Sequence, residues 1–379
     1  MKGYSKDFGP FESTIWLNCA HQGPLPKVAI AQAKEAVAWK IAPDKMTTER
    51  FTQVPDNLRR VLGKLIAAPP EDVILGNSAS YGLHLLANGI LWKAGDEILL
   101  VEGDFPADIL PWLGLRNKGV NIRFVKPRQY VMQPDELLRN ITPSTKLLCT
   151  TLVHSFSGFV ADVQALGEIC RARGILLILN VSQALGARCF RVSETSVDAI
   201  VGVGFKWLCG PYGTGFCWIN PPLRESLQYN QSYWLTMQTA DDLAKEQNIP
   251  SLRDDLGARR YDVFGTANFF NVKPLTASVE YLLAQGIANI EAHDQKLITR
   301  LIEAMDPEKY DLLSPRDETM RSTLVFISHK EPARNSEVYE KLLKEKVFVA
   351  YRTGKLRFSP HLYNTEADID QALSILNSV

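Results

Sequence analysis

The sequence lacks the features that mark a membrane protein, a secreted disulfide-bonded protein or a nucleic-acid-binding protein. Basic and acidic side chains balance at 42 each among 379 residues, so no net charge favours nucleic acid or an anionic membrane as partner. No apolar run approaches the roughly 20 residues of a membrane helix. The first residues, MKGYSKDFGPFEST, contain no apolar segment typical of a signal peptide. We therefore expect a cytoplasmic protein that acts on a small molecule.

Several common catalytic motifs are also absent. The six cysteines form no CxxC pair and no disulfide-like spacing, so we expect small buried hydrophobic side chains. The six histidines form no HExxH motif, and we predict no metal centre. No GxGxxG follows the first strand, and no GxSxG is present. These absences argue against a dinucleotide site and against a serine hydrolase.

Apolar runs alternate with helical patterns over most of the chain. Such alternation is typical of βαβ units, so we predict an α/β fold whose large domain holds a mainly parallel seven-stranded sheet flanked by helices. We assign residues 16–270 to this domain, and residues 1–15 and 271–379 to a smaller α+β domain. The predicted strands of the large sheet are Asp72–Leu75, Glu97–Val101, Asn121–Val125, Lys146–Thr151, Ile175–Leu179, Ala199–Val203 and Gly215–Ile219.

Helical periodicity and polar stretches complete this outline. Residues 221–258 are polar and irregular, which predicts a long excursion or a partner contact. A single long helix is expected over about 274–300, leading into the smaller domain. Other predicted helices cover about 27–41, 54–67, 83–91, 107–117, 163–173, 336–345 and 366–378, with smaller-domain strands at 323–328 and 347–352.

Lys206 is the centre of the functional hypothesis. It follows the strand Ala199–Val203, stands between Phe205 and Trp207, and precedes a glycine-rich turn. An amine removed from water has a lowered pKa and becomes a nucleophile toward carbonyl groups. The alternative is a lysine whose ammonium group reaches the surface at a strand end.

Polar clusters follow four other predicted strands. Since ligand sites of parallel sheets lie beyond the carboxyl ends of the strands, these clusters are expected to share one crevice. Each also has a structural interpretation: a helix cap, a packed phenylalanine, a loop histidine and a turn asparagine. The clusters are Asn77–Ser80, Asp104–Asp108, His154–Gly158 and Asn180–Gln183.

Taken together, these motifs resemble those of pyridoxal-phosphate enzymes of fold type I, most closely the class V aminotransferase family. That family includes cysteine desulfurases, isopenicillin N epimerase-like proteins and kynureninase. The similar segments include NSASYGLHLL at 77–86, FPAD at 105–108, RYDVFGT at 260–266 and LRFSPHLYNTEADID at 356–370. The resemblance implies an enzyme that acts on a small amino acid through a cofactor–substrate imine, and a homodimer with shared active sites.

The resemblance also implies roles for individual residues. Lys206 would hold pyridoxal 5'-phosphate as an imine and move the α-proton of the substrate. Thr266 would reach the phosphate of the neighbouring subunit, and Arg357 would bind the substrate carboxylate, a good use of its two-pronged donor geometry. Ala20 and His21 would line the substrate pocket. The other implied cofactor contacts are Ser78, Ala79, Ser80, Phe105, Asp108, His154, Asn180 and Gln183.

Three departures from the family pattern bear on activity. Asn180 stands where the family carries an aspartate that keeps the pyridine nitrogen protonated, which predicts a weaker electron sink and poor full transamination. Val203 and Phe205 replace hydroxyl and imidazole groups, which predicts lower cofactor affinity. No cysteine follows Cys217, which disfavours persulfide transfer. A C–S or β-lyase, an epimerase and a non-catalytic cofactor-binding homologue therefore stay open beside an aminotransferase.

Overall fold

A seven-stranded mixed sheet forms the centre of the protein. The computed structural model describes residues 4–228, 230–245 and 250–379. The strand order is β2-β8-β7-β6-β5-β3-β4, and β8 alone runs antiparallel to its neighbours. The strands are β2 (Val73–Gly76), β8 (Gly215–Ile219), β7 (Ala199–Val203), β6 (Leu176–Asn180), β5 (Thr145–Thr151), β3 (Glu97–Val101) and β4 (Asn121–Val125). The predicted fold class is thus confirmed.

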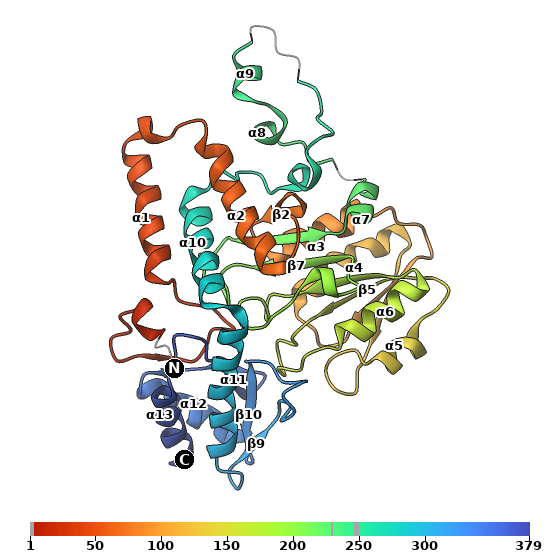
Figure 1. Cartoon of the computed structure of the whole chain (residues 1–379). Helices are drawn as coiled ribbons and strands as arrows, with labels where there is room; N and C mark the ends of the chain where they lie inside the picture. Colours follow the sequence, from red (N-terminus) through yellow and green to blue (C-terminus); the bar gives the residue numbers. More distant parts are fainter. Residues whose placement is uncertain (1–3, 229, 246–249) are drawn as a thin grey trace.

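Apolar side chains on both faces of the sheet explain the continuous apolar runs. In β3, Ile98 and Leu100 join one buried cluster, whereas Leu99 and Val101 join the other. This is the two-residue alternation of a strand covered on both sides. One cluster contains α3 (Ala79–Gly89) and α4 (Leu110–Leu113), and the other contains α2 (Arg50–Ile66) and α6 (Val163–Arg173). Figure 1 shows these helices on the two faces of the sheet.

Three predicted helices differ from the observed ones. The helix expected at 107–117 is broken into short turns around α4, because Pro111 has no N–H to donate. The helix expected at 274–300 divides into α10 (Phe269–Gln285) and α11 (Ile287–Ala304) at Gly286, whose φ is +85°. Helix α3 begins at Ala79, four residues earlier than expected, because the Ser78 side chain caps it.

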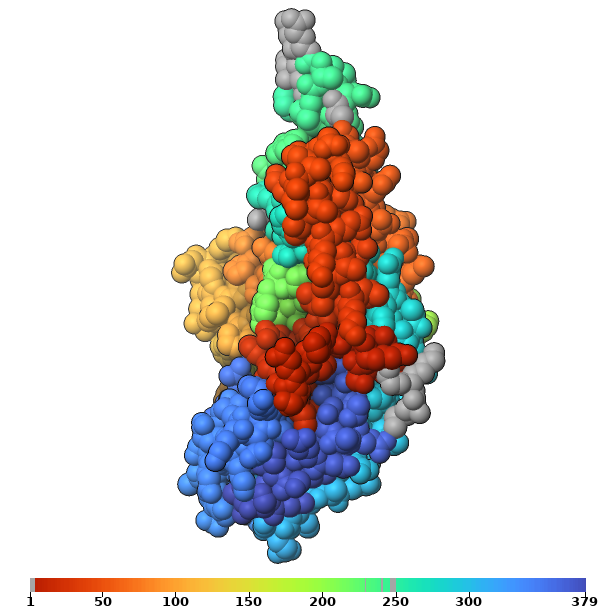
Figure 2. Space-filling view, turned by 90° about the vertical axis from the view of Figure 1, so that its left-hand side faces the viewer, coloured from red at the N-terminus to blue at the C-terminus, as the bar shows by residue number. Residues whose placement is uncertain are grey.

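The C-terminal part forms a separate antiparallel sheet in the order β12-β13-β10-β9. Its strands are β12 (Ala350–Arg352), β13 (Lys355–Phe358), β10 (Val325–His329) and β9 (Tyr310–Leu312), and helices α12 (Asn335–Lys344) and α13 (Glu366–Asn377) accompany them. Near the N-terminus, β1 (Ile15–Trp16) pairs with β11 (Val347–Phe348). Figure 2 shows the N-terminal residues over the junction between α1 (Lys27–Ile41) and the C-terminal part. The predicted domain boundaries stay a prediction.

The irregular segment predicted at 221–258 leaves the body of the molecule. It carries α7 (Pro221–Ser226), α8 (Trp234–Met237) and α9 (Ala240–Leu243), and the last two stand apart from the sheet in Figure 1. Trp234 and Leu252 are exposed there, as is Phe264 just beyond the segment. Among the described residues, no helix is both long enough and apolar enough to cross a membrane.

Candidate active site

A cavity of about 380 Å³ lies where the strands of the large sheet end. Thr151, Asn180 and Val203 are the final residues of β5, β6 and β7, and all three line it. The predicted crevice beyond the carboxyl ends of the strands therefore exists. It brings together ten of the residues singled out from the sequence: Ala20, His21, Ser78, Ala79, Ser80, Phe105, Asn180, Gln183, Lys206 and Arg357.

Lys206 lies in the loop between β7 and β8 and faces this cavity. Its Nζ is 5.5 Å from the centre of the Phe105 ring and 5.9 Å from that of Phe205. Phe205 in turn stacks on Tyr212 with ring centres 4.3 Å apart. Burial, followed by the nearby Arg357 charge, lowers the pKa of Lys206 to about 8. The neutral, nucleophilic form of the amine is thus a minority at physiological pH, but far more abundant than in an ordinary lysine.

Two arginines make one side of the cavity cationic. Arg357 is buried, and its guanidinium makes only long hydrogen bonds, to Ser155 O (3.5 Å) and Asn18 Oδ1 (3.4 Å). Its Nε has no partner. Burial, then the charge of Arg352, lowers the pKa of Arg357 to about 10. A buried cation without a carboxylate partner is suited to bind an anionic ligand.

The start of α3 supplies a second anion-binding feature. The first backbone N–H groups of a helix have no partner within it, and here they belong to Ala79 and Ser80 on the cavity wall. Ser78 Oγ accepts a hydrogen bond from Tyr81 N (3.2 Å), which fixes the first turn. A Cβ on Gly215 would lie 2.6 Å from Ser78 N, so only glycine lets β8 pass this close to the cap.

Asn180 is held in one orientation by two hydrogen bonds. Its Nδ2 donates to Asp108 Oδ1 (2.8 Å), and its Oδ1 accepts from Ser182 N (2.9 Å). A flipped amide would place oxygen against the oxygen of Asp108 and N–H against the N–H of Ser182. The remaining N–H of the Asn180 amide is therefore left to face the cavity as a hydrogen-bond donor. An aspartate at this position would present an acceptor instead.

Asp108 lies behind Asn180, outside the cavity lining. Burial and then the nearby Asp104 raise the pKa of Asp108 well above the ordinary aspartate value. Burial also raises the pKa of Asp104 to about 7. Each aspartate has one buried oxygen without a hydrogen-bond partner. Burial thus favours the neutral form of Asp108, which then supplies little charge to the cavity, whereas Asp104 is about half ionised at neutral pH.

Gln183 is fixed as firmly as Asn180. Its Nε2 donates to Ala20 O (3.2 Å), and its Oε1 accepts from Trp207 Nε1 (2.9 Å). These bonds tie the segment after β6 to the N-terminal segment and to the residue after Lys206.

His154 and Thr266, also singled out from the sequence, lie outside the cavity lining. Both ring nitrogens of His154 have partners, Ser157 Oγ at 2.8 Å and Gly103 O at 3.1 Å. Burial lowers the pKa of His154. Thr266 lines two neighbouring cavities instead, one of which also contains Arg59 and Asp262.

Several lining residues were missed from the sequence. Arg352 enters the cavity from β12, beside Arg357 of β13, and Phe156 stacks on Phe105 with ring centres 6.1 Å apart. Alternation in the β12–β13 hairpin could have indicated Arg352, because Ala350 pairs with Arg357 and Arg352 lies two residues on, on the same face. Tyr212 carries no comparable signal. Phe156 and three further lining residues lie within the strand-end clusters predicted from the sequence but had no individual role there, and Thr151 ends a predicted strand; the three are Ala107, Ser155 and Ser182.

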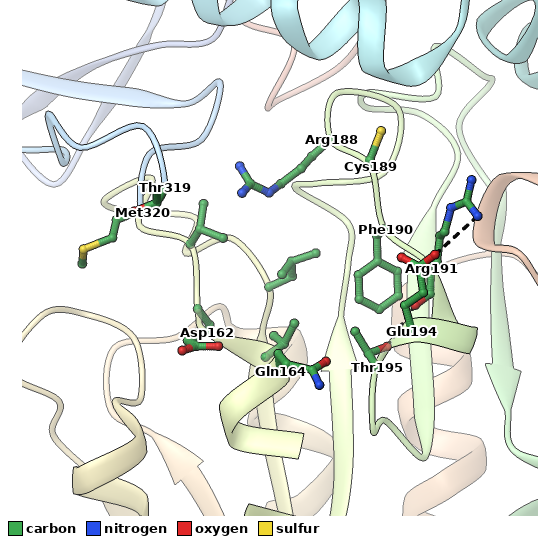
Figure 3. A pocket seen from close by; sticks show the side chains of 14 residues that line it. Asp162, Gln164, Arg188, Cys189, Phe190, Arg191, Glu194, Thr195, Thr319 and Met320 are labelled. Atoms are coloured by element: carbon green, nitrogen blue, oxygen red, sulfur yellow. Dashed lines mark hydrogen bonds and ion pairs between the residues drawn. The ribbon is translucent and has the colours of Figure 1, made fainter. Parts of the chain in front are cut away.

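A larger cavity of about 540 Å³ lies away from these residues, around Arg188, Phe190 and Met320 (Figure 3). None of the predicted site residues lines it. Its charged groups already have partners, since Arg191 pairs with Glu194 and Arg188 with Glu291. Size alone therefore does not identify the functional cavity.

The fold and the strand-end cavity define a fold type I architecture with a partly buried lysine at the cavity. The model of the class V aminotransferase family matches residues 44–372. The chain belongs to this family, whose members are pyridoxal-phosphate-dependent enzymes, so the predicted family, enzyme class and cofactor class are confirmed at that level.

Individual relatives are distant. The chain is 26% identical to an uncharacterized aminotransferase of Bacillus subtilis, covering 83% of this chain and 81% of that protein. It is 25% identical to isopenicillin N epimerase of Streptomyces clavuligerus, covering 97% and 95%. A solved structure of a C-DES mutant, with glycine covalently linked to its pyridoxal-phosphate cofactor, superposes with a TM-score of 0.87 at 18% identity, covering 98% of each chain. This structural likeness shows the fold.

Proposed function

We propose that this chain binds pyridoxal phosphate in the strand-end cavity, through Lys206, and acts there on a small amino acid. The observation that carries the proposal is the Lys206 amine, with its lowered pKa, beside the ring of Phe105. It faces the same cavity as Arg357, which has no carboxylate partner among the described residues. When bound, the cofactor supplies an electrophilic carbonyl and an electron-withdrawing ring.

The donor set fits this cofactor. The free N–H groups at the start of α3 and the Ser80 hydroxyl suit a phosphate. Phe105 covers one face of a planar ring, and Lys206 reaches its carbonyl. Arg357 then binds the substrate carboxylate, and Lys206 takes and returns the substrate α-proton. The lining at Ala20 and His21 closes the substrate end.

The experiment adds pyridoxal phosphate to the purified protein and then reduces it with borohydride. We expect a yellow absorption band that reduction abolishes, and a mass increase on the peptide that contains Lys206. Lys146 is the matched control, because it also lies near an aromatic ring, 5.3 Å from Trp92, but far from the cavity. A colourless protein, or a label on Lys146 instead, would overturn the proposal.

A second candidate reaction is favoured by the fixed amide of Asn180. The N–H of Asn180 that is left free by Asp108 would pair with an unprotonated ring nitrogen of the bound cofactor, and such a ring would withdraw electrons weakly. Full transamination needs that withdrawal most, because the cofactor itself must exchange the amino group. A C–S or β-lyase needs it less, since a leaving group removes the electron pair from the substrate, and an epimerase returns the proton at the same carbon.

Products decide between these reactions. We expect amino acids with a β-leaving group, or a single enantiomer of an alanine-like substrate, to be converted faster than any amino group is transferred to a 2-oxo acid. Asn180→Asp should raise half-transamination by at least about tenfold, since one pKa unit of ring-nitrogen support corresponds to about 1.4 kcal/mol. No gain in any half-reaction would argue against this role of Asn180, and no turnover in either protein would favour the non-catalytic homologue.

Thr266 supports a shared active site. Thr266 lies outside the cavity of its own chain, while Phe264 and Trp234 nearby are large exposed apolar side chains. We infer a homodimer in which Thr266 contacts the phosphate of the neighbouring subunit. Phe264→Asp should produce monomers and weaken cofactor binding together, as measured by light scattering and by the absorption band. A monomer that binds cofactor normally would contradict the shared site.

A further inference from the structure

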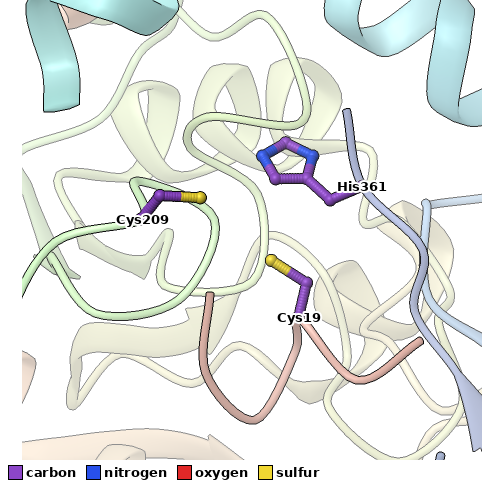
Figure 4. A group of neighbouring side chains, drawn as sticks. All are labelled: Cys19, Cys209 and His361. Atoms are coloured by element: carbon purple, nitrogen blue, oxygen red, sulfur yellow. The ribbon is translucent and has the colours of Figure 1, made fainter. Parts of the chain in front are cut away.

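Directly behind the Lys206 loop, two thiols and an imidazole meet in the interior (Figure 4). The Cys19 sulfur, the Cys209 sulfur and a His361 ring nitrogen all lie within 4.8 Å of one another, and all three side chains are fully buried. They come from three segments far apart in the sequence. The catalytic proposal does not use them.

The His361 ring is oriented as in a metal site. Its Nδ1 lies 2.7 Å from Asp294 Oδ2, and its Nε2 donates to Trp207 O (3.1 Å), a hydrogen bond that a metal ion on Nε2 would replace. In Figure 4 one ring nitrogen points toward the Cys209 sulfur. Metal-binding histidines commonly bond a carboxylate through their other nitrogen, which fixes the tautomer and the ring.

Oxygen atoms border the same site. Trp207 O is 3.1 Å from His361 Nε2 and 3.9 Å from Cys209 Sγ. Bond lengths of about 2.0–2.3 Å around a tetrahedral zinc ion place neighbouring ligands about 3.3–3.8 Å apart. The Tyr363 hydroxyl is buried beside Cys19. A fourth donor is therefore available next to the two sulfurs and the nitrogen.

Cys209 also occupies a backbone position that disfavours cysteine. Its φ is +50°, in the left-handed region where glycine is the preferred residue, and Gly210 follows directly. Ser278 Oγ holds this turn through hydrogen bonds to Leu208 O (2.7 Å) and Cys209 O (3.0 Å). Glycine would adopt this φ more readily, yet the position holds a cysteine whose side chain is fully buried beside Cys19 and His361.

We propose that Cys19, Cys209 and His361 form a structural binding site for a zinc-type divalent cation. Two thiolates and one imidazole are the donors that zinc prefers, and a closed, buried site is typical of a structural ion. The ion would join the N-terminal segment, the loop after Lys206 and the segment after β13. Because Cys209 N donates to Lys206 O (2.9 Å), it would hold the backbone of the lysine from behind.

Metal content tests the site without any reference to pyridoxal phosphate. The full chain is produced in zinc-supplemented medium and purified without chelators, and metals are measured by mass spectrometry. We expect about one zinc per chain, lost in Cys209→Gly and retained in Cys170→Ala, a buried cysteine of α6 away from the cluster. Cobalt-substituted protein should show the visible bands of a tetrahedral thiolate site, absent in Cys209→Gly.

The same variant separates a metal ligand from a packing residue. Cys209→Gly relieves the positive φ but also removes a fully buried core side chain, so its melting temperature alone does not report on the metal. The decisive quantity is the zinc-dependent change: adding zinc to chelator-treated protein should raise the melting temperature of wild type and leave that of Cys209→Gly unchanged. Wild type that holds no zinc, shows no cobalt bands and gains no melting temperature from zinc would overturn the site.

Discussion

Two buried arginines, each 4% exposed, have opposite surroundings. Arg59 in α2 bonds both oxygens of Asp262 and also donates to Val73 O at 2.9 Å. Although burial opposes it, the Asp262 charge raises the pKa of Arg59. Arg357 has no carboxylate partner, and its pKa is lowered to about 10. The two arginines are equally buried but differ in their partners. The paired guanidinium of Arg59 stabilises the fold, whereas that of Arg357 is available to bind a ligand.

The largest expected effect breaks the structural pair. Arg59→Met leaves the Asp262 carboxylate buried beside an apolar side chain, which costs about 3–5 kcal/mol of unfolding free energy. Urea denaturation measures this loss. Arg59→Met/Asp262→Asn should recover part of it, because a neutral amide still accepts the bond from Leu75 N (2.9 Å). If the double variant is no more stable than the single one, the pair is not the source of the stability.

The corresponding change at Arg357 should affect binding instead of folding. Arg357→Met removes a buried charge without a partner, so the unfolding free energy should stay the same or rise. Loss of a charge-assisted bond to a substrate carboxylate costs about 1.5–3 kcal/mol, or about 10–150-fold in affinity. Urea denaturation measures the effect on folding. The amino-acid concentration needed to shift the cofactor band measures the effect on binding. If Arg357→Met lost as much unfolding free energy as Arg59→Met, the proposed difference between the two arginines would be wrong.

The smallest effect concerns the pH dependence of Lys206. Its pKa is about 8, so trapping of the amine by pyridoxal phosphate and borohydride should rise as pH rises through about 8 and then level off. Arg357→Met removes a nearby positive charge, and the midpoint should move upward, toward the ordinary lysine value. Arg352→Met is the control, because Arg352 does not contribute to the Lys206 shift. An unchanged midpoint in Arg357→Met would mean that burial alone lowers this pKa.

Much of the large domain could be predicted from local patterns. Strands β3, β7 and β8 begin and end where the sequence predicted, because apolar runs covered on both faces are bounded by polar or glycine residues. The edge strand β4 also has the predicted bounds, although only Val125 in it is buried. Helix boundaries were less predictable. A serine cap lengthened α3, and one glycine divided α10 from α11.

The residues of the candidate active site also divide into those that local patterns could predict and those that they could not. Residues at strand ends were predictable, since parallel strands deliver their carboxyl ends to one crevice. Tyr212 was not, because it reaches the cavity from the loop between β7 and β8, whose direction depends on distant packing. Arg352 could be inferred only from the alternation in the β12–β13 hairpin. The position of Asp108 behind Asn180, and not on the cavity wall, also depends on how two loops meet.

By itself the sequence determined the order of strands along the chain, the lysine between aromatic residues and the family, because each depends on neighbours within a few positions. Only the tertiary structure decided which charges remain unpaired and which side chains meet behind Lys206. Cys19, Cys209 and His361 show no metal-binding spacing in the sequence, yet folding brings them within 4.8 Å. Ion pairs and side-chain clusters form between residues that are far apart in the sequence, so local sequence patterns do not predict them.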